Sequence, residues 1–81
     1  MLYLFAQIFY AECPSGEYTI PSSMDEIPEY QFLNCQDLTS IIIPNHVSKI
    51  GARAFEACSN LQSVSMTNNV TSIGEYAFFF L

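Results

Sequence analysis

Residues 38–58 of this chain recur 23 positions later, as residues 61–81. The first copy reads LTSIIIPNHVSKIGARAFEAC and the second reads LQSVSMTNNVTSIGEYAFFFL, with eight of 21 aligned positions identical. A fixed period between about 20 and 50 residues is typical of a repeat array, in which each unit buries its apolar side chains against the next one. The sequence therefore predicts a solenoid, which presents a surface rather than enclosing a catalytic cleft.

A weaker copy precedes these two, so that nearly all of the chain after residue 14 consists of one repeated unit. The matching positions are Ile20, Pro21, Ile27, Phe32 and Cys35 in the first copy and Ile43, Pro44, Ile50, Phe55 and Cys58 in the second. We therefore expect one solenoid domain over residues 15–81, with repeats at 15–37, 38–60 and 61–81.

The apolar positions of the middle copy indicate how one unit folds. Ile41 and Ile43 alternate with period two and so point to the same face of a strand, which Pro44 should end. Val47 and Ile50 face inward along a second extended stretch, and Gly51 allows a turn that other residues resist. The spacing of Ala54, Phe55 and Cys58 suits a short turn of α- or 3₁₀-helix.

These patterns predict the positions of the elements in all three copies. We expect strands near 18–20, 39–43 and 63–66, shorter extended pieces near 25–27, 47–50 and 70–73, and helical turns near 29–33, 52–57 and 75–79.

The pattern resembles the BspA-type leucine-rich repeat, whose 23-residue consensus is L-x-x-I-x-I-P-x-x-V-x-x-I-G-x-x-A-F-x-x-C-x-x-L. The middle copy fits it at Leu38, Ile41, Ile43, Pro44, Val47, Ile50, Gly51, Ala54, Phe55, Cys58 and Leu61. The outer copies depart from it at Ser15, Pro28, Gln31, Thr67 and Leu81. The resemblance implies an α/β leucine-rich-repeat solenoid of about three coils with a short parallel sheet. It also implies an extracellular or surface-attached protein that binds other macromolecules, often in microbial adhesion.

Composition limits the classes of partner. The chain has 81 residues, a hydrophobic content of 51% and a net charge of −6 from eight acidic and two basic residues. Such an apolar content excludes a disordered chain, and the negative charge argues against nucleic acids and anionic membranes as partners. The apolar run from Leu2 to Tyr10 is too short to span a bilayer, so we expect no membrane span.

The N-terminal segment, residues 1–14, has two open interpretations. It is either a signal peptide cleaved after Ala11 or a cap that covers the first coil, because Phe9 lies 23 residues before Phe32. A signal peptide favours an extracellular or cell-surface location, whereas a cap leaves a cytoplasmic location open.

The other end reads Phe78-Phe79-Phe80-Leu81 and carries no polar capping coil. Terminal repeats normally need a polar outer face, and uncovered strand edges pair with other chains. We therefore expect either a fragment of a longer array or self-association through this end.

Three cysteines, Cys13, Cys35 and Cys58, are spaced by 22 and 23 residues and form no C-x-x-C pair that would indicate zinc. Cys35 and Cys58 occupy the same slot of successive repeats, and Leu81 fills that slot in the third. We therefore favour buried thiols in an apolar slot, with a Cys35–Cys58 or a Cys13–Cys35 disulfide as the alternatives.

The remaining polar residues do not form a catalytic set. His46 has Ser23 and Asn69 as its counterparts, so it is expected in an outer turn, away from the inward Cys58. The carboxylates Asp25, Glu26 and Glu29 have no acidic counterparts in the next repeat and are expected on a solvated face. We therefore expect neither an enzyme nor a metal or cofactor site.

The candidate binding surface is the outward face of the strands. Its predicted members are Glu17, Thr19, Ser40, Ile42, Ser63 and Ser65, which parallel stacking would align in columns about 4.8 Å apart. A face rich in serine and threonine suits a protein or glycan ligand. Asn69-Val70-Thr71 is in addition a candidate N-glycosylation triplet. The predicted function is a non-catalytic macromolecular interaction module, surface-bound or secreted, that adheres to host or neighbouring cells. The alternative is a structural fragment without independent function.

Overall fold

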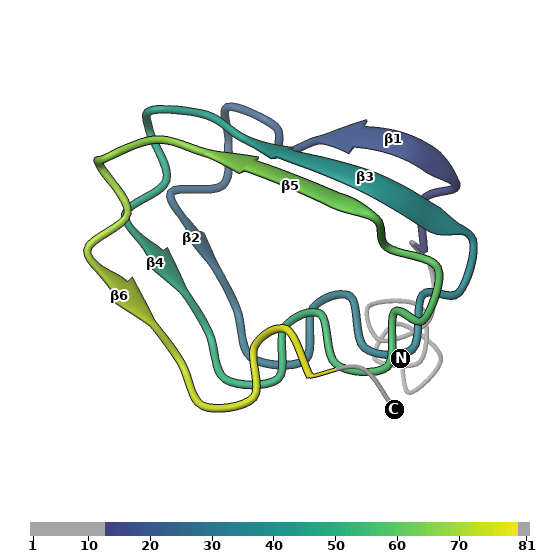
Figure 1. Cartoon of the computed structure of the whole chain (residues 1–81). Helices are drawn as coiled ribbons and strands as arrows, with labels where there is room; N and C mark the ends of the chain where they lie inside the picture. The colour runs from purple at the N-terminus through teal and green to yellow at the C-terminus, as the bar shows by residue number, and fades with distance from the viewer. Residues whose placement is uncertain (1–12, 80–81) are drawn as a thin grey trace, which may run out of the picture.

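Six short strands form two parallel sheets that face each other across one core. The computed structural model describes residues 13–79 (Figure 1). The first sheet has the order β1-β3-β5 and the second has the order β2-β4-β6. The strand bounds are β1 Gly16–Thr19, β2 Glu26–Ile27, β3 Leu38–Ile43, β4 Lys49–Ile50, β5 Ser63–Met66 and β6 Ser72–Ile73.

The register of both sheets is one repeat. Ser40 pairs with Ser63 in the first sheet and Ile50 pairs with Ile73 in the second, so these residues lie against their counterparts 23 positions away. A register shift after Gly16 pairs that residue with Leu38, 22 positions away. We call the three layers rung 1 (residues 16–37), rung 2 (residues 38–60) and rung 3 (residues 61–79). Viewed along the stack, each rung has three sides: a long strand, a short strand and a run of turns (Figure 1).

The apolar ladder residues lie between these sides. Ile41 and Ile43 are buried, whereas Ser40 and Ile42 on the alternate face are partly exposed, which confirms the predicted direction of this strand. The buried residues are Ile20, Ile27, Phe32, Cys35, Leu38, Ile41, Ile43, Val47, Ile50, Ala54, Phe55, Cys58, Leu61 and Ala77. Each rung thus closes the core of its neighbour, as the repeat pattern predicts.

The strands lie close to their predicted positions. β5 has the predicted bounds, β3 begins one residue earlier, and β1 is displaced toward the N-terminus to Gly16–Thr19. The short strands occupy only the last two residues of the predicted stretches at 25–27 and 47–50, and the last two of 70–73.

The predicted helical turns near 29–33, 52–57 and 75–79 are not helices in the described structure. Alternate N–H groups there donate to the next rung, as from Phe32 to the Ala54 carbonyl at 2.8 Å. The N–H groups between them donate three residues back within the rung, as from Leu33 to Tyr30 at 3.1 Å. An α-helix needs consecutive N–H groups to donate four residues back, and a 3₁₀-helix needs consecutive ones to donate three residues back. Because only alternate N–H groups donate within the rung, these segments form linked tight turns instead.

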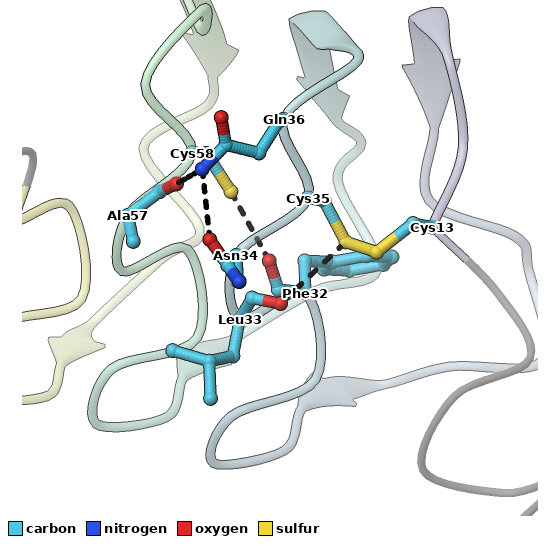
Figure 2. Close-up of a disulfide and its surroundings, with 8 residues drawn as sticks. All are labelled: Cys13, Phe32, Leu33, Asn34, Cys35, Gln36, Ala57 and Cys58. Atoms are coloured by element: carbon cyan, nitrogen blue, oxygen red, sulfur yellow. Dashed lines mark hydrogen bonds between the residues drawn. A yellow bond between two sulfur atoms is a disulfide. The ribbon is translucent and has the colours of Figure 1, made fainter.

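A disulfide joins Cys13 to Cys35 (Figure 2), which corrects the expectation of buried thiols for these two residues. Cys13 lies at an exposed position just before β1, within bonding reach of the slot that Cys35 occupies in rung 1. The expectation is confirmed for Cys58, a free and buried thiol that donates to the Phe32 carbonyl at 3.1 Å. Of the two disulfides held open, the structure contains the one between Cys13 and Cys35.

The predicted signal peptide or cap, residues 1–14, lies almost wholly outside the described residues, which begin at Cys13. Phe80 and Leu81 also lie outside them.

Candidate interaction surface

The six predicted binding residues lie on one face, the outer side of the β1-β3-β5 sheet. Glu17, Ser40 and Ser63 share one register position across the sheet, and Thr19, Ile42 and Ser65 share the position two residues further along the strands. We call these six residues the strand face. The structure therefore brings them together in the two columns that the repeat predicts.

The strand face is polar, with one acidic end and one apolar side chain. The Ser40 and Ser63 hydroxyls lie 2.8 Å apart and hydrogen-bond to each other, which fixes neighbouring rungs side by side. Glu17 supplies the face with its one charge, and Ile42 is its one aliphatic residue. Such a surface offers hydroxyl donors and acceptors around a small apolar centre, which are the contacts that a protein partner uses at an interface.

Side chains of the outer turns, which connect the two sheets, bind the backbone of the preceding rung. His46 Nε2 lies 2.9 Å from the Pro21 carbonyl oxygen, and Asn69 Nδ2 donates to the Asn45 carbonyl at 2.9 Å. These bonds satisfy carbonyl groups that no strand partner reaches. The same role at corresponding positions indicates that His46 serves the stack rather than chemistry.

Asn69 is exposed, as the glycosylation prediction requires, but its amide already has a structural partner. Thr71, the third residue of the triplet, donates its hydroxyl to the Ser48 carbonyl at 3.3 Å. Both polar groups of the triplet therefore hold rung 3 against rung 2 in the folded chain, and glycosylation at Asn69 stays a prediction.

On the side of rung 3 that faces away from rung 2, repeat positions whose side chains are buried in rung 2 are exposed. Val64 and Ile73 are 37% and 51% exposed, whereas their counterparts Ile41 and Ile50 are at most 1% exposed. The same contrast separates Met66 from Ile43. We call Val64, Met66 and Ile73 the rung-3 face.

The groups with catalytic potential are dispersed. His46 contacts the backbone of rung 1 in an outer turn, while the Cys58 thiol is buried in the core and faces Phe32 (Figure 2). Burial raises the pKa of the Cys58 thiol, and a backbone hydrogen bond from Cys35 offsets this only in part. A buried, protonated thiol is a poor nucleophile. Within residues 13–79, no group of three or more His, Cys, Asp or Glu residues is placed to hold a metal ion.

Two features of the structure lay beyond the favoured sequence interpretation. One is the Cys13–Cys35 disulfide, which was one of two alternatives, because Cys13 falls one position off the 23-residue register of the other cysteines. The other is the exposed side formed by the turns, for which the only signal is the recurrence of Glu29-Tyr30 as Glu75-Tyr76.

Comparison with known proteins agrees with the resemblance to a repeat family. The family model described as BspA type leucine rich repeat region (6 copies) matches residues 4–80. The chain belongs to the BspA type leucine-rich repeat family. The leucine-rich repeat is the basis for treating this chain as a protein-interaction module, and repeat regions of this kind are generally non-catalytic. No curated protein and no solved structure gives a significant match.

The search for a membrane-spanning helix was negative over the described part of the chain, residues 13–79.

Proposed function

We propose that this chain is a non-catalytic module of a surface-bound or secreted protein, which binds a protein ligand through the strand face in adhesion to host or neighbouring cells. The observation that carries this proposal is the register of the first sheet, which aligns Glu17, Ser40 and Ser63 in one column and Thr19, Ile42 and Ser65 in the next. The hydroxyl groups of this face are held in fixed positions by the sheet, and a ligand can contact them without disturbing the core.

The location outside the cytoplasm rests on the disulfide. Bonds such as Cys13–Cys35 form and persist in oxidising compartments and are rare in the cytosol. Family membership supports the same location, because the resemblance implies surface-attached proteins. We also propose that residues 15–81 form one solenoid with repeats at 15–37, 38–60 and 61–81, since the rungs follow this period throughout the described residues.

Cell binding tests the strand face directly. The chain, labelled with a fluorophore, is incubated with intact cells and bound protein is measured by flow cytometry. Ser65→Arg places a large cation on the strand face and should reduce binding about tenfold, the usual order for a disrupted contact. Ser72→Arg is the matched control, because Ser72 is an exposed serine of rung 3 on the other sheet.

Equal loss of binding for the two variants would refute the strand face. Binding that is lost only after glycosidase treatment of the cells would replace the protein ligand with a glycan.

Secretion tests the location. Intact mass is measured for chain recovered from the medium and from the lysate of a secreting eukaryotic cell. A secreted product that lacks residues 1–11 supports the extracellular reading, and added glycan mass that disappears in Asn69→Gln identifies the glycosylation site. An uncleaved product found only in the lysate contradicts it.

A second candidate, a structural fragment that associates with other chains, is favoured by the rung-3 face. Its apolar side chains lie beside the edge strands β5 and β6, and exposed apolar edges are sites of association. Light scattering over a concentration series tests it. Ile73→Lys should abolish any growth in mass, whereas Ser72→Lys, which points away from the core, should not. A monomer at all concentrations would exclude this candidate.

A further inference from the structure

The third side of each rung, formed by the turns after β2, β4 and β6, carries a second patch of large exposed side chains. Tyr30 and Leu33 belong to rung 1, and Tyr76 and Phe79 belong to rung 3; they are between 39% and 51% exposed. The Tyr76 and Phe79 rings contact each other edge to face at 5.2 Å. We call these four residues, with Glu29 and Glu75, the turn-side patch. It lies on a different side of the rungs from the strand face (Figure 1).

The backbone of this patch is left-handed at a position that recurs in every rung, because the linked turns impose this conformation. Tyr30 and Tyr76 have φ of 62° and 60°, and Arg53 occupies the same position of rung 2 with φ of 58°. A left-handed conformation costs an L-residue about 1–2 kcal/mol, and glycine or asparagine would relieve most of that cost. Both tyrosines are about half exposed, so the core does not require their rings. The turns therefore fix the backbone at this position, whereas packing leaves the two tyrosine rings exposed for contact with a partner.

One ring of this patch, that of Tyr76, already binds a cation within the chain. The Arg53 guanidinium lies 4.6 Å from the centroid of the Tyr76 ring, a cation–π distance. Arg53 also pairs with Glu56 at 2.8 Å, so its charge is compensated inside rung 2. The patch is thus chemically suited to guanidinium groups, and Arg53 does not add an unbalanced positive charge to it.

The charge around the tyrosines is negative. Glu29 and Glu75 precede Tyr30 and Tyr76 directly and are exposed. Lys49 and Arg53 are the two basic residues of the chain, and they pair with Glu26 and Glu56. Among residues 13–79, neither Glu29 nor Glu75 has an ion-pair partner within 4.0 Å. Each tyrosine therefore stands beside a carboxylate that is available to an incoming cation.

The spacing of the two sites fits an extended peptide. Tyr30 and Tyr76 lie two rungs apart, which corresponds to about 10 Å at the usual strand separation. In the polyproline II conformation, an extended form with three residues per turn, residues three positions apart point to the same side and are separated by about 9 Å. We propose that the turn-side patch binds a basic, extended segment of a partner protein through two arginines or lysines spaced three residues apart. One cation stacks on Tyr30 and the other on the face of the Tyr76 ring that Arg53 does not cover. Each pairs with the adjacent glutamate, while Leu33 and Phe79 contact the aliphatic parts of the segment.

Fluorescence anisotropy with designed peptides tests the proposal on the full chain. The probe is a labelled eight-residue peptide of glycine and serine with arginines at its third and sixth positions. The comparison peptide has the same composition with adjacent arginines. We expect the first peptide to bind at least about fivefold more tightly, because only it reaches both tyrosine–glutamate pairs.

Variants of the protein measure the contributions of the glutamates and the tyrosines to peptide binding separately. Glu29→Gln with Glu75→Gln should weaken binding of the first peptide about tenfold, and Tyr30→Asn should weaken it about threefold. Asparagine adopts the left-handed conformation readily, as Asn34 does in the same rung at φ of 63°, so Tyr30→Asn should still fold. Glu17→Gln removes one negative charge from the strand face, as Glu29→Gln alone does from the turn-side patch, and should change the affinity by less than about twofold.

Three results would overturn the proposal: no binding at about 1 mM peptide, equal affinity for the two peptides, or an equal loss in Glu17→Gln and Glu29→Gln. The last would show general attraction to an acidic protein. Concentration-dependent self-association that Tyr76→Ala abolishes would also overturn it and would assign the patch to a second copy of this chain. None of these results depends on the ligand of the strand face, so the two proposals stand or fall separately.

Discussion

Gly51 lies where the backbone of rung 2 approaches rung 1 most closely, at the corner that follows β4. A Cβ atom at this position would lie 2.5 Å from the Glu29 nitrogen and 2.7 Å from the Pro28 carbonyl carbon, both of them backbone atoms. The Gly51 N–H also donates to the Ile27 carbonyl at 2.7 Å, so the two rungs cannot separate without breaking a hydrogen bond. Glycine is therefore needed here for close approach rather than for an unusual φ.

Gly51→Ala should lower the free energy of unfolding by about 2–3 kcal/mol, because backbone atoms cannot move away as a side chain does. Urea unfolding followed by circular dichroism measures this loss. Gly16→Ala is the comparison, since a Cβ atom there meets nothing within 4 Å and the cost is only that of φ at 72°, about 1 kcal/mol. An equal or smaller loss for Gly51→Ala would contradict the close approach.

Cys58 should be protected from alkylation by its burial. Because burial raises the pKa of its thiol, the folded chain holds this proton at pH values where an exposed thiol is ionised. We expect iodoacetamide to label folded chain at least roughly 100-fold more slowly than urea-unfolded chain, in which one free thiol reacts. Rapid labelling of the folded chain, read by intact mass, would show that rung 2 opens easily.

The same pKa shift makes stability depend on pH in one direction. Below the ordinary thiol pKa, Cys58 is protonated in both states and its contribution is fully present. As the pH rises above that value, the unfolded chain releases the proton and the folded chain keeps it, so the free energy of unfolding falls. Subtracting the pH profile of Cys58→Val isolates this contribution, and a difference that rises with pH would have the wrong sign.

At the scale of the elements, three phenylalanines form a continuous stack through the rungs. Phe55 lies between Phe32 at 5.1 Å and Phe78 at 5.2 Å, with ring planes inclined by 13° and 3°. Phe55 is fully buried, whereas Phe78 is partly buried at the free side of rung 3. The middle ring therefore contributes on both of its faces and the outer ring mainly on one.

Phe55→Ala should cost about 3–5 kcal/mol and Phe78→Ala about 1–2 kcal/mol, because the first leaves a closed cavity and the second only a shallower edge. Urea midpoints of the two variants give the order. Phe55→Leu keeps most of the volume and provides a measurable value if the alanine variant does not fold. A larger loss at Phe78 than at Phe55 would mean that rung 3 holds the stack together.

The elements show which part of the fold the sequence could predict. Period-two alternation in Ile41 and Ile43 identified a strand and its inward face, and the 23-residue repeat identified its partners, because corresponding residues of successive repeats pair with each other. The outward columns of the strand face followed from the same two facts. Pattern alone could not distinguish a helix from linked turns at Ala54, Phe55 and Cys58, since both place these side chains inward. The hydrogen bonds of the backbone N–H groups distinguish the two conformations, and half of these bonds go to carbonyl groups of the neighbouring rung.

The turn-side patch was also beyond prediction for a physical reason. A left-handed φ at Tyr30 is imposed by the linked turns and has no signature in a tyrosine. Without this φ, sequence spacing does not place Tyr30 and Leu33 on a common exposed side.

At the scale of the whole molecule, the Cys13–Cys35 disulfide links two segments that lie about one repeat apart. It closes a loop across a sequence separation of 22 residues, for which the chain-entropy relation gives about 3 kcal/mol of stabilisation. Cys13→Ser should remove that contribution and leave the Cys35 thiol in its apolar slot, as Cys58 is in rung 2. The difference between oxidised wild type and Cys13→Ser in urea measures it. Reduced wild type is the internal control and should match the variant, and a variant as stable as the oxidised chain would show that the bond is dispensable.

The hydrogen bonds between rungs all run along the direction in which the rungs stack, and this decides how the molecule yields to force. A force along that direction breaks the hydrogen bonds between rungs a few at a time, so that the rungs separate one after another. While the Cys13–Cys35 bond is intact, the residues between the two cysteines cannot extend under force. An oxidised molecule held at its ends should therefore extend roughly 75 Å less than a reduced one. Under the adhesive function proposed above, the redox state of this one bond would set how far the molecule extends under load.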